Sequence, residues 1–220
     1  MHRRVIGIDT GGTFTDGVLM NYRTREVLKT TKTLTTRHDL KQGVLKAIDN
    51  LHIEGVENIK MVGVSSTLAT NSIAEGKARK TGLLLIGYDP ELIDKYGLAG
   101  KFHSDTVGYF AGGHTSQGAE KEPFDEDGVR KWIEARKDEV DAVAVSSYFS
   151  PLNTEHEDRA FKIIDGACDL PVVMGHQLST KLDSVKRAAT ASLNASLVAV
   201  MQDFIYAVRT SMEEHGIKAP

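Results

Sequence analysis

An acidic, glycine-rich turn near the start of the chain is the segment whose residue types could do chemistry. It reads DTGGTFTD over residues 9–16 and follows the apolar stretch Val5–Ile8. Successive backbone N–H groups in such a turn can converge on phosphate oxygens, and glycine lets the backbone approach them closely. The threonine hydroxyls add donors, and Asp9 is placed to hold the hydrated Mg²⁺ that accompanies a nucleotide. The turn therefore predicts a site for nucleotide phosphates and magnesium.

The turn matches neither of the two common phosphate-binding signatures. A Walker A loop needs G-x-x-x-x-G-K-[ST], and a dinucleotide fingerprint needs G-x-G-x-x-G at the start of a helix. Here the residues after Gly12 are β-branched and aromatic, which is typical of a strand. The phosphates are therefore expected to meet a hairpin and not a helix end. The alternative is a tight hairpin selected only for its turn geometry.

Apolar periodicity divides the chain into strands and helices that position this turn. We expect strands over 4–9, 13–22, 26–34, 59–65, 81–87, 141–147 and 170–174. We expect helices over 39–51, 66–75, 89–96, 125–139 and 183–215, a loop followed by a helix within 151–165, and an irregular hairpin over 109–124. The first three strands form a meander and the later ones alternate with helices, so the sequence predicts an α/β fold with a mixed sheet.

Composition narrows the class of protein. Lys and Arg number 27 against 30 Asp and Glu, a net charge of −3 that does not favour a nucleic-acid partner. The one cysteine, Cys168, forms no disulfide within the chain, which favours the reducing cytoplasm. The longest apolar runs have strand length, so no membrane partner is expected. The eight histidines show no metal-ligand spacing, and we expect His114 to be an exposed loop residue.

An ordered set of motifs resembles the hydantoinase/oxoprolinase family of the actin/Hsp70/sugar-kinase superfamily. The first turn is similar to that family's G-[IV]-D-x-G-G-T-F-T-D start. The segment VSSTLATN over 64–71 resembles its H-G-T-T-x-A-T-N turn, without the leading His and Gly. The segment SYFSPLNTEHE over 147–157 resembles its F-x-N-P-x-H-E stretch, and ASLNA over 191–195 resembles its N-A helix. The resemblance covers about residues 4–200.

The resemblance implies a fold and a reaction. The fold would be an RNase H-like lobe of the actin/hexokinase type, with a mixed five-stranded sheet flanked by helices. The reaction would be the ATP-dependent opening of a cyclic amide such as a hydantoin or 5-oxoproline, in which ATP phosphorylates the amide oxygen before water attacks. Related members form carboxylase subunits that activate a substrate with ATP.

The resemblance also implies a set of site residues. Asp9 would be the catalytic residue and would orient Mg²⁺ through bound water. The cofactor-binding residues would be Gly11, Gly12, Thr13, Phe14, Thr15, Asp16, Thr67 and Asn71. Asp16 could instead be a polar residue at a strand edge. Thr67 and Asn71 could instead be a helix N-cap and part of a polar helix face.

The expected domains are a phosphate-binding lobe over 1–185, with a hairpin insertion near 100–124, and a long helix over 186–220. That helix would lead toward a second lobe absent from this sequence, or toward a partner subunit, and a homo-oligomer is a further possibility. Two alternative functions stay open. One is a small-molecule kinase lobe of the sugar-kinase type, although no segment clearly supplies its Asp base. The other is a non-catalytic nucleotide-binding or assembly subunit.

Overall fold

The structure is a computed structural model, and it describes residues 3–36, 40–76, 79–104 and 106–220. The chain divides into two compact units: Met1–Lys77 with Val200–Pro220, and Ala78–Ala199. We call them unit 1 and unit 2. The long helix α7 (Ser184–Glu214) contributes to both. This division differs from the predicted lobe over 1–185 and helix over 186–220.

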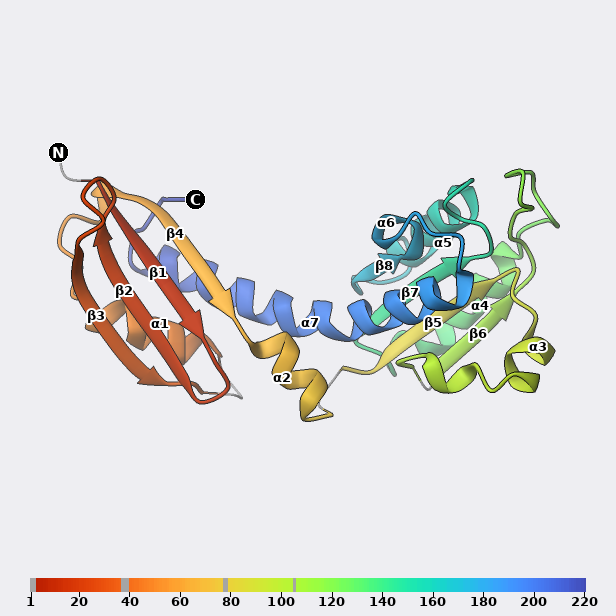
Figure 1. Cartoon of the computed structure of the whole chain (residues 1–220), viewed down its shortest axis with the longest axis horizontal. Coiled ribbons are helices and arrows are strands. Elements are labelled where there is room, and N and C mark those ends of the chain that lie inside the picture. Colours follow the sequence, from red (N-terminus) through yellow and green to blue (C-terminus); the bar gives the residue numbers. More distant parts are fainter. Residues whose placement is uncertain (1–2, 37–39, 77–78, 105) are drawn as a thin grey trace. The chain divides into compact units, whose positions relative to one another are not determined.

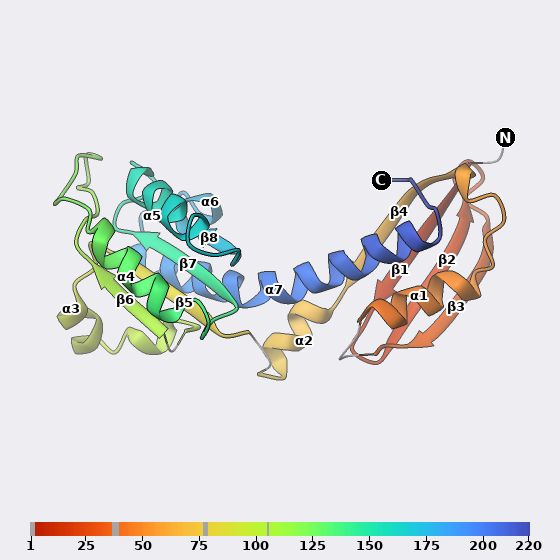
Figure 2. The same cartoon turned by 180° about the vertical axis from the view of Figure 1, so that it is seen from behind.

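Unit 1 is a four-stranded sheet with helices on one face (Figures 1 and 2). Its elements are β1 (Arg4–Thr10), β2 (Phe14–Asn21), β3 (Val27–Leu34), α1 (Leu40–Asn50), a 3₁₀ turn (Val56–Asn58), β4 (Ile59–Ser66) and α2 (Leu68–Ala74). The strand order is β3-β2-β1-β4, with β1 antiparallel to β2 and parallel to β4. The predicted helix start at residue 39 lies outside the described residues.

One face of the unit 1 sheet carries its core because apolar residues alternate along the strands. Ile6, Ile8 and Leu19 are buried against the apolar residues of α1 and of the C-terminal part of α7. Figure 2 shows both helices in front of the sheet, whereas the opposite face is turned toward the viewer in Figure 1 without a helix over it. The open face is therefore where the remaining side chains of β1 and β2 lie.

Unit 2 is a parallel sheet of order β6-β5-β7-β8. Its elements are β5 (Thr81–Ile86), α3 (Pro90–Lys95), a 3₁₀ turn (Ala99–Lys101), β6 (Thr106–Phe110), α4 (Glu126–Arg136), β7 (Ala142–Ser147), α5 (Glu155–Asp165), β8 (Val172–Met174) and α6 (Gly175–Leu178). Strands β5 and β7 are buried at every position, as expected for parallel strands covered on both faces. One face packs against α4 and α5, the other against the start of α7.

Helix α7 is long and apolar enough, by length and composition, to cross a membrane. Its apolar residues have another explanation in this structure. Ala188, Ala191 and Ala195 are buried in the core of unit 2, and Phe204 and Val208 are buried in the core of unit 1. The apolar character of α7 is thus that of a helix serving two cores.

Two sequence predictions about the fold need correction. The expected single five-stranded mixed sheet is wrong, because the strands form two sheets of four strands each. The expected irregular hairpin over 109–124 is correct only in part, because Thr106–Phe110 is a strand parallel to β5. After it the chain is irregular, and an isolated antiparallel bridge between His114 and Glu120 is the part of the segment that turns back as a hairpin does. The glycines of this segment suggested a hairpin, whereas the strand before them is too short for its sequence pattern to indicate a strand clearly.

Candidate functional site

The predicted phosphate turn joins β1 to β2 and is tight. The Gly11 N–H donates to the Phe14 carbonyl at 2.9 Å, and the Thr35 N–H donates to the Thr13 carbonyl at 2.9 Å. A Cβ on Gly11 would lie 3.3 Å from the Phe14 carbonyl oxygen, so a larger residue would crowd the turn. Thr13 is exposed, and Gly12 is half-buried. Both residues lie in the turn between the end of β1 and the start of β2.

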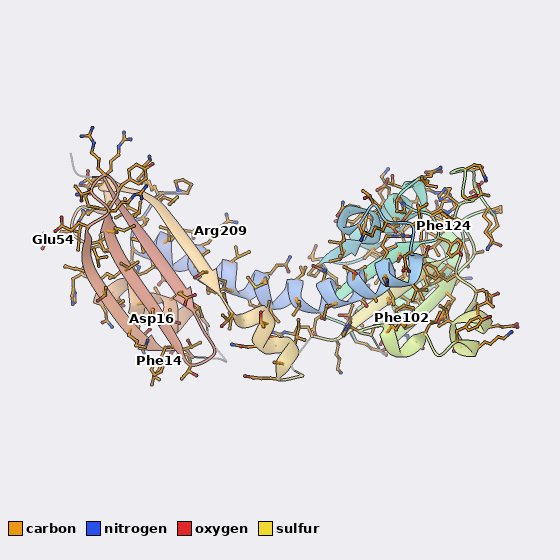
Figure 3. The ribbon with its side chains drawn as sticks, viewed as in Figure 1. Phe14, Asp16, Glu54, Phe102, Phe124 and Arg209 are labelled. Atoms are coloured by element: carbon orange, nitrogen blue, oxygen red, sulfur yellow. The ribbon has the colours of Figure 1, made fainter. Side chains whose placement is uncertain are left out.

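Four polar side chains form a row across the open face next to this turn. The strand register places Ser65 beside Asp9, Asp9 opposite Asp16, and Asp16 opposite Lys32. The Ser65 hydroxyl donates to Asp9 Oδ1 at 2.5 Å, and Lys32 Nζ lies 2.9 Å from Asp16 Oδ1. We call Ser65, Asp9, Asp16 and Lys32 the carboxylate row. Figure 3 labels Asp16 near the end of the sheet, close to Phe14.

A pocket of about 490 Å³ opens on the same face of the sheet. It is lined by Gly7, Ile8, Asp9, Asp16, Gly17, Val18, Thr30, Thr31, Gly63, Val64 and Ser65. Asp9, Asp16 and Ser65 form one end of it, while Gly7, Gly63 and Val18 lie one cross-strand row further along. The pocket therefore combines an acidic end beside the turn with an apolar floor.

The second predicted segment lies beside the first turn. The Thr67 N–H donates to the Thr10 carbonyl at 3.3 Å, and Thr67 Oγ1 would be 3.8 Å from a Cβ on Gly11. Asn71 Nδ2 donates to Thr67 Oγ1 at 3.2 Å. Thr67 is the N-cap of α2, but its side chain makes no capping hydrogen bond. The structure thus places Thr67 beside the β1–β2 turn and Asn71 against Thr67, and the binding of the cofactor by these two residues stays a prediction.

Thr15 does not reach the open face, whereas Phe14 lies beside the carboxylate row. Thr15 is fully buried, on the face that α1 covers, and its hydroxyl lies 3.0 Å from that of Thr35. A phosphate contact by the Thr15 hydroxyl is therefore corrected to a structural role beneath the turn. Phe14 is 42% exposed, and Lys32 Nζ lies 4.9 Å from its ring centroid.

The carboxylate row fits a magnesium ion. Mg²⁺ prefers oxygen ligands and is usually held by one or two carboxylates together with water and substrate phosphates. Asp9 is exposed, Asp16 is half-exposed, and the two are direct cross-strand partners. In the described residues no group of three or more His, Cys, Asp or Glu side chains could hold a metal by itself. A two-carboxylate site that also needs nucleotide phosphates agrees with both observations.

Sequence reasoning missed a second polar cluster, at the carboxyl ends of the parallel strands of unit 2. His114, expected to be exposed, is fully buried, and its two ring nitrogens have no partner among the described residues. Burial, and secondly the neighbouring His156, lower the pKa of His114. His156 Nδ1 accepts from the Gly113 N–H at 2.9 Å, and its Nε2 lies 3.1 Å from Glu120.

Glu157 belongs to the same edge and is also fully buried. Its carboxylate accepts from the Ser147 N–H at 2.8 Å and from the His176 N–H at 2.9 Å, and His176 Nδ1 lies 2.6 Å away. This hydrogen bond raises the pKa of His176. Arg187 is buried nearby and donates to the Ser147 carbonyl at 2.9 Å. In the sequence, the adjacent residues His156 and Glu157 were the feature that could have indicated this second polar cluster.

The fold and the open-face site define an α/β protein with a glycine-rich hairpin on a mixed sheet. Comparison with known proteins agrees with this class. The model of the hydantoinase/oxoprolinase N-terminal region matches residues 5–168. The chain therefore belongs to the hydantoinase/oxoprolinase family, as its motifs predicted.

Two curated relatives match nearly the whole chain. The caprolactamase subunit alpha of Pseudomonas jessenii is 29% identical over 98% of this chain, which covers 34% of that protein. The acetophenone carboxylase gamma subunit of Aromatoleum aromaticum (strain DSM 19018 / LMG 30748 / EbN1) is 29% identical over 96% of this chain, which covers 33% of that protein. The chain thus spans about a third of the length of these relatives.

Two solved structures share the fold. The ATP-dependent caprolactamase from Pseudomonas jessenii superposes with a TM-score of 0.75 at 28% identity, over 98% of this chain and 34% of the other. A nucleotide-free acetone carboxylase superposes with a TM-score of 0.76 at 18% identity, over 99% of this chain and 35% of the other. The second likeness is one of fold alone.

Proposed function

We propose that this chain supplies the phosphate- and magnesium-binding part of an enzyme that uses ATP to open a cyclic amide. The observation that carries the proposal is the carboxylate row beside the glycine turn, in which two carboxylates share one exposed sheet face. Similarity to a protein described as an ATP-dependent caprolactamase supports both the nucleotide and the substrate class.

The residues take the following roles. The backbone N–H groups of Gly12 and Thr13, with the Thr13 hydroxyl, bind the phosphates, and Asp9 and Asp16 hold Mg²⁺. The Ser65 hydroxyl fixes the rotamer of Asp9 through their 2.5 Å hydrogen bond. The metal, when bound, neutralises charge on the transferring phosphate. Positioning and charge stabilisation of this kind supply most of the catalysis of phosphoryl transfer.

The reaction activates an unreactive amide. The amide oxygen forms a bond to the γ-phosphorus of ATP while the bond to ADP breaks. Water then attacks the activated ring carbon, the ring C–N bond breaks with protonation of the nitrogen, and a second water releases phosphate. The net consumption is one ATP and two waters for one ring opened.

The proposal also includes a further lobe or a partner subunit. The relatives are named as alpha and gamma subunits, and the chain spans about a third of their length. A nucleotide bound at one sheet face needs further contacts for its base and sugar. We therefore propose a second lobe or subunit that completes the site, with unit 1 as the RNase H-like part.

Calorimetric titration of the 220-residue chain with ATP in the presence of Mg²⁺ tests the nucleotide site. We expect binding that Asp9→Asn weakens by about tenfold or more, because one metal-binding carboxylate is lost. Asp94→Asn, which removes an exposed carboxylate in α3, is the matched control and should leave the affinity unchanged. Absence of Mg²⁺-dependent ATP binding by the wild-type chain would contradict the proposal.

A second candidate function is ATP-dependent activation of a carboxylase substrate. It is favoured by one observation: the acetophenone carboxylase subunit and the caprolactamase subunit are equally similar to this chain, at 29% identity each. Phosphate release by the protein separates the candidates. Release that depends on hydantoin, 5-oxoproline or ε-caprolactam supports amide opening, whereas release that depends on a ketone together with bicarbonate supports the carboxylase function.

A further inference from the structure

Gly63, in the middle of β4, is a glycine that packing within the protein does not explain. Its Cβ, if present, would meet only the Ile6 carbonyl oxygen, at 3.9 Å, and its φ lies outside the left-handed region. The neighbouring Gly7 is different, because a Cβ there would lie 2.8 Å from Val18 Cγ1. Gly7 is therefore required by its neighbour, whereas Gly63 leaves space on the open face.

A glycine inside a strand weakens the strand, since it adds backbone entropy to the unfolded chain and offers no side chain to pack. Where no turn or close backbone contact requires it, such a glycine often marks the approach of a ligand. Gly63 lines the pocket on the open face. Its missing side chain keeps that part of the pocket open.

The position of Gly63 relative to the carboxylate row sets the geometry. Gly63 lies beside Gly7, and Ser65 lies beside Asp9, two residues further along the same pair of strands. Two residues along a strand span about 7 Å. Gly7, Gly63 and Val18 thus form an apolar floor about 7 Å from the carboxylates, in which Val18 covers Gly7 and only Gly63 is left open.

We infer that this floor is the seat of the ring of the cyclic amide substrate, an inference that rests on the proposed function. The ring of a small cyclic amide fits over Gly63, where no side chain projects, and a pocket of about 490 Å³ has room for it. The ring lies over Gly63 with its amide oxygen turned toward the carboxylate row. That orientation brings the oxygen to the terminal phosphate, while Thr30 lines the pocket from β3.

The purine base of the nucleotide is the competing occupant of the same floor. In this proposal the phosphates are bound at the β1–β2 turn, and the floor begins two residues along the strand from Asp9. A base on the floor would need the phosphates and ribose to fold back over this short distance. The amide has to lie next to the terminal phosphate to react, so its ring is the occupant that the distance favours.

Gly63→Val tests the inference. Valine fills the floor, and as a β-branched residue in a strand it should keep or raise the thermal stability of the chain. The probes are hydantoin, 5-oxoproline and ε-caprolactam, titrated by saturation-transfer NMR in the presence of Mg²⁺ and a non-hydrolysable ATP analogue. We expect Gly63→Val to weaken the bound amide by about tenfold or more through overpacking, and Gly63→Ala to have a smaller effect in the same direction.

Controls separate this inference from the proposed function. Met61→Val changes the same strand outside the pocket lining and should leave both affinities within about twofold. The affinity for the ATP analogue should stay unchanged in Gly63→Val. Loss of nucleotide affinity in that variant, unchanged amide affinity, or binding of the ATP analogue by a wild-type chain that binds no amide would each overturn the inference and leave the nucleotide site standing. A wild-type chain that binds no nucleotide overturns the proposed function itself.

Discussion

Asp9 and Asp16 are direct cross-strand partners in the β1–β2 pair, and their side chains lie on the same open face of the sheet. Like charges placed directly opposite each other destabilise a sheet. Here each carboxylate has its own partner, Ser65 for Asp9 and Lys32 for Asp16. The unfavourable pair is thus retained and only partly compensated, which is the arrangement expected where a cation binds.

Lys32→Met should make the row more attractive to Mg²⁺. Lys32 neutralises Asp16 through contacts of 2.9 and 3.2 Å to its two oxygens, so its removal leaves two uncompensated carboxylates. We expect the Kd for Mg²⁺ alone to fall by about threefold, and the difference to shrink at high salt because the pair is exposed. Calorimetric titration with MgCl₂ measures both effects.

Lys29→Met is the matched control for this experiment. Lys29 lies on the same strand, but it pairs with Leu19 and donates to the His52 carbonyl at 2.8 Å. Its replacement should leave the Kd for Mg²⁺ unchanged. An equal effect of both lysine variants would show a general change in surface charge and would remove the specific role of Lys32.

The part of the site that the sequence predicted is local. The β1–β2 turn, Asp9 and the second turn at Thr67 could be recognised because each depends on a few adjacent residues. Lys32 could not be found in this way, because its place depends on the β2–β3 register. Met20 pairs with Val27, and continuing that register would put Thr31 opposite Asp16. The register shift after Leu19 brings Lys32 there instead.

The prediction of the fold was also correct for local elements and wrong where strands from distant parts of the sequence pair. Most strands and helices follow from local periodicity, and Asp89 caps α3 by accepting from the Glu91 N–H at 2.9 Å. The grouping of strands into two sheets depends on pairings between distant segments. His114 follows β6 and is buried, and β6 is parallel to β5. The glycines after β6 suggested a hairpin instead, so the sequence indicated neither the pairing nor the burial.

Thr15→Val should separate the structural role of this residue from nucleotide binding. The Thr15 hydroxyl is buried and lies 3.0 Å from that of Thr35, so valine removes one hydrogen bond at nearly constant volume. We expect the free energy of unfolding to fall by about 1 kcal/mol, as measured by urea denaturation. The affinity for MgATP should stay the same. Thr13→Val, at an exposed position of the turn, should show the opposite pattern.

His176→Gln should lower stability most at acidic pH. The hydrogen bond to Glu157 raises the pKa of His176 above its ordinary value of 6.5 in the folded protein. The stabilisation from the protonated imidazole is therefore complete below pH 6.5 and is lost as the pH rises through the folded pKa. We expect the variant to lose about 1 kcal/mol more at pH 6 than at pH 9. Equal losses at both values would mean that the charge of His176 does not contribute.

His114→Phe should change stability with the opposite dependence on pH. Burial lowers the pKa of His114 below 6.5, so the unfolded chain binds a proton more readily than the folded one. Folding stability is then complete above pH 6.5 and falls as the pH drops toward the folded pKa. Phenylalanine has a similar shape and no buried nitrogen without a partner, so it removes this penalty.

We expect the variant to be more stable than the wild type by about 1 kcal/mol at pH 5.5, and we expect this gain in the free energy of unfolding to be smaller at pH 8. Denaturation by urea at the two pH values measures this difference. His103→Phe is the control, since His103 is an exposed histidine of the same unit. A gain that does not depend on pH would point to packing alone. A loss at both pH values would show that the two ring nitrogens of His114 make hydrogen bonds, which in this buried position would be to ordered water.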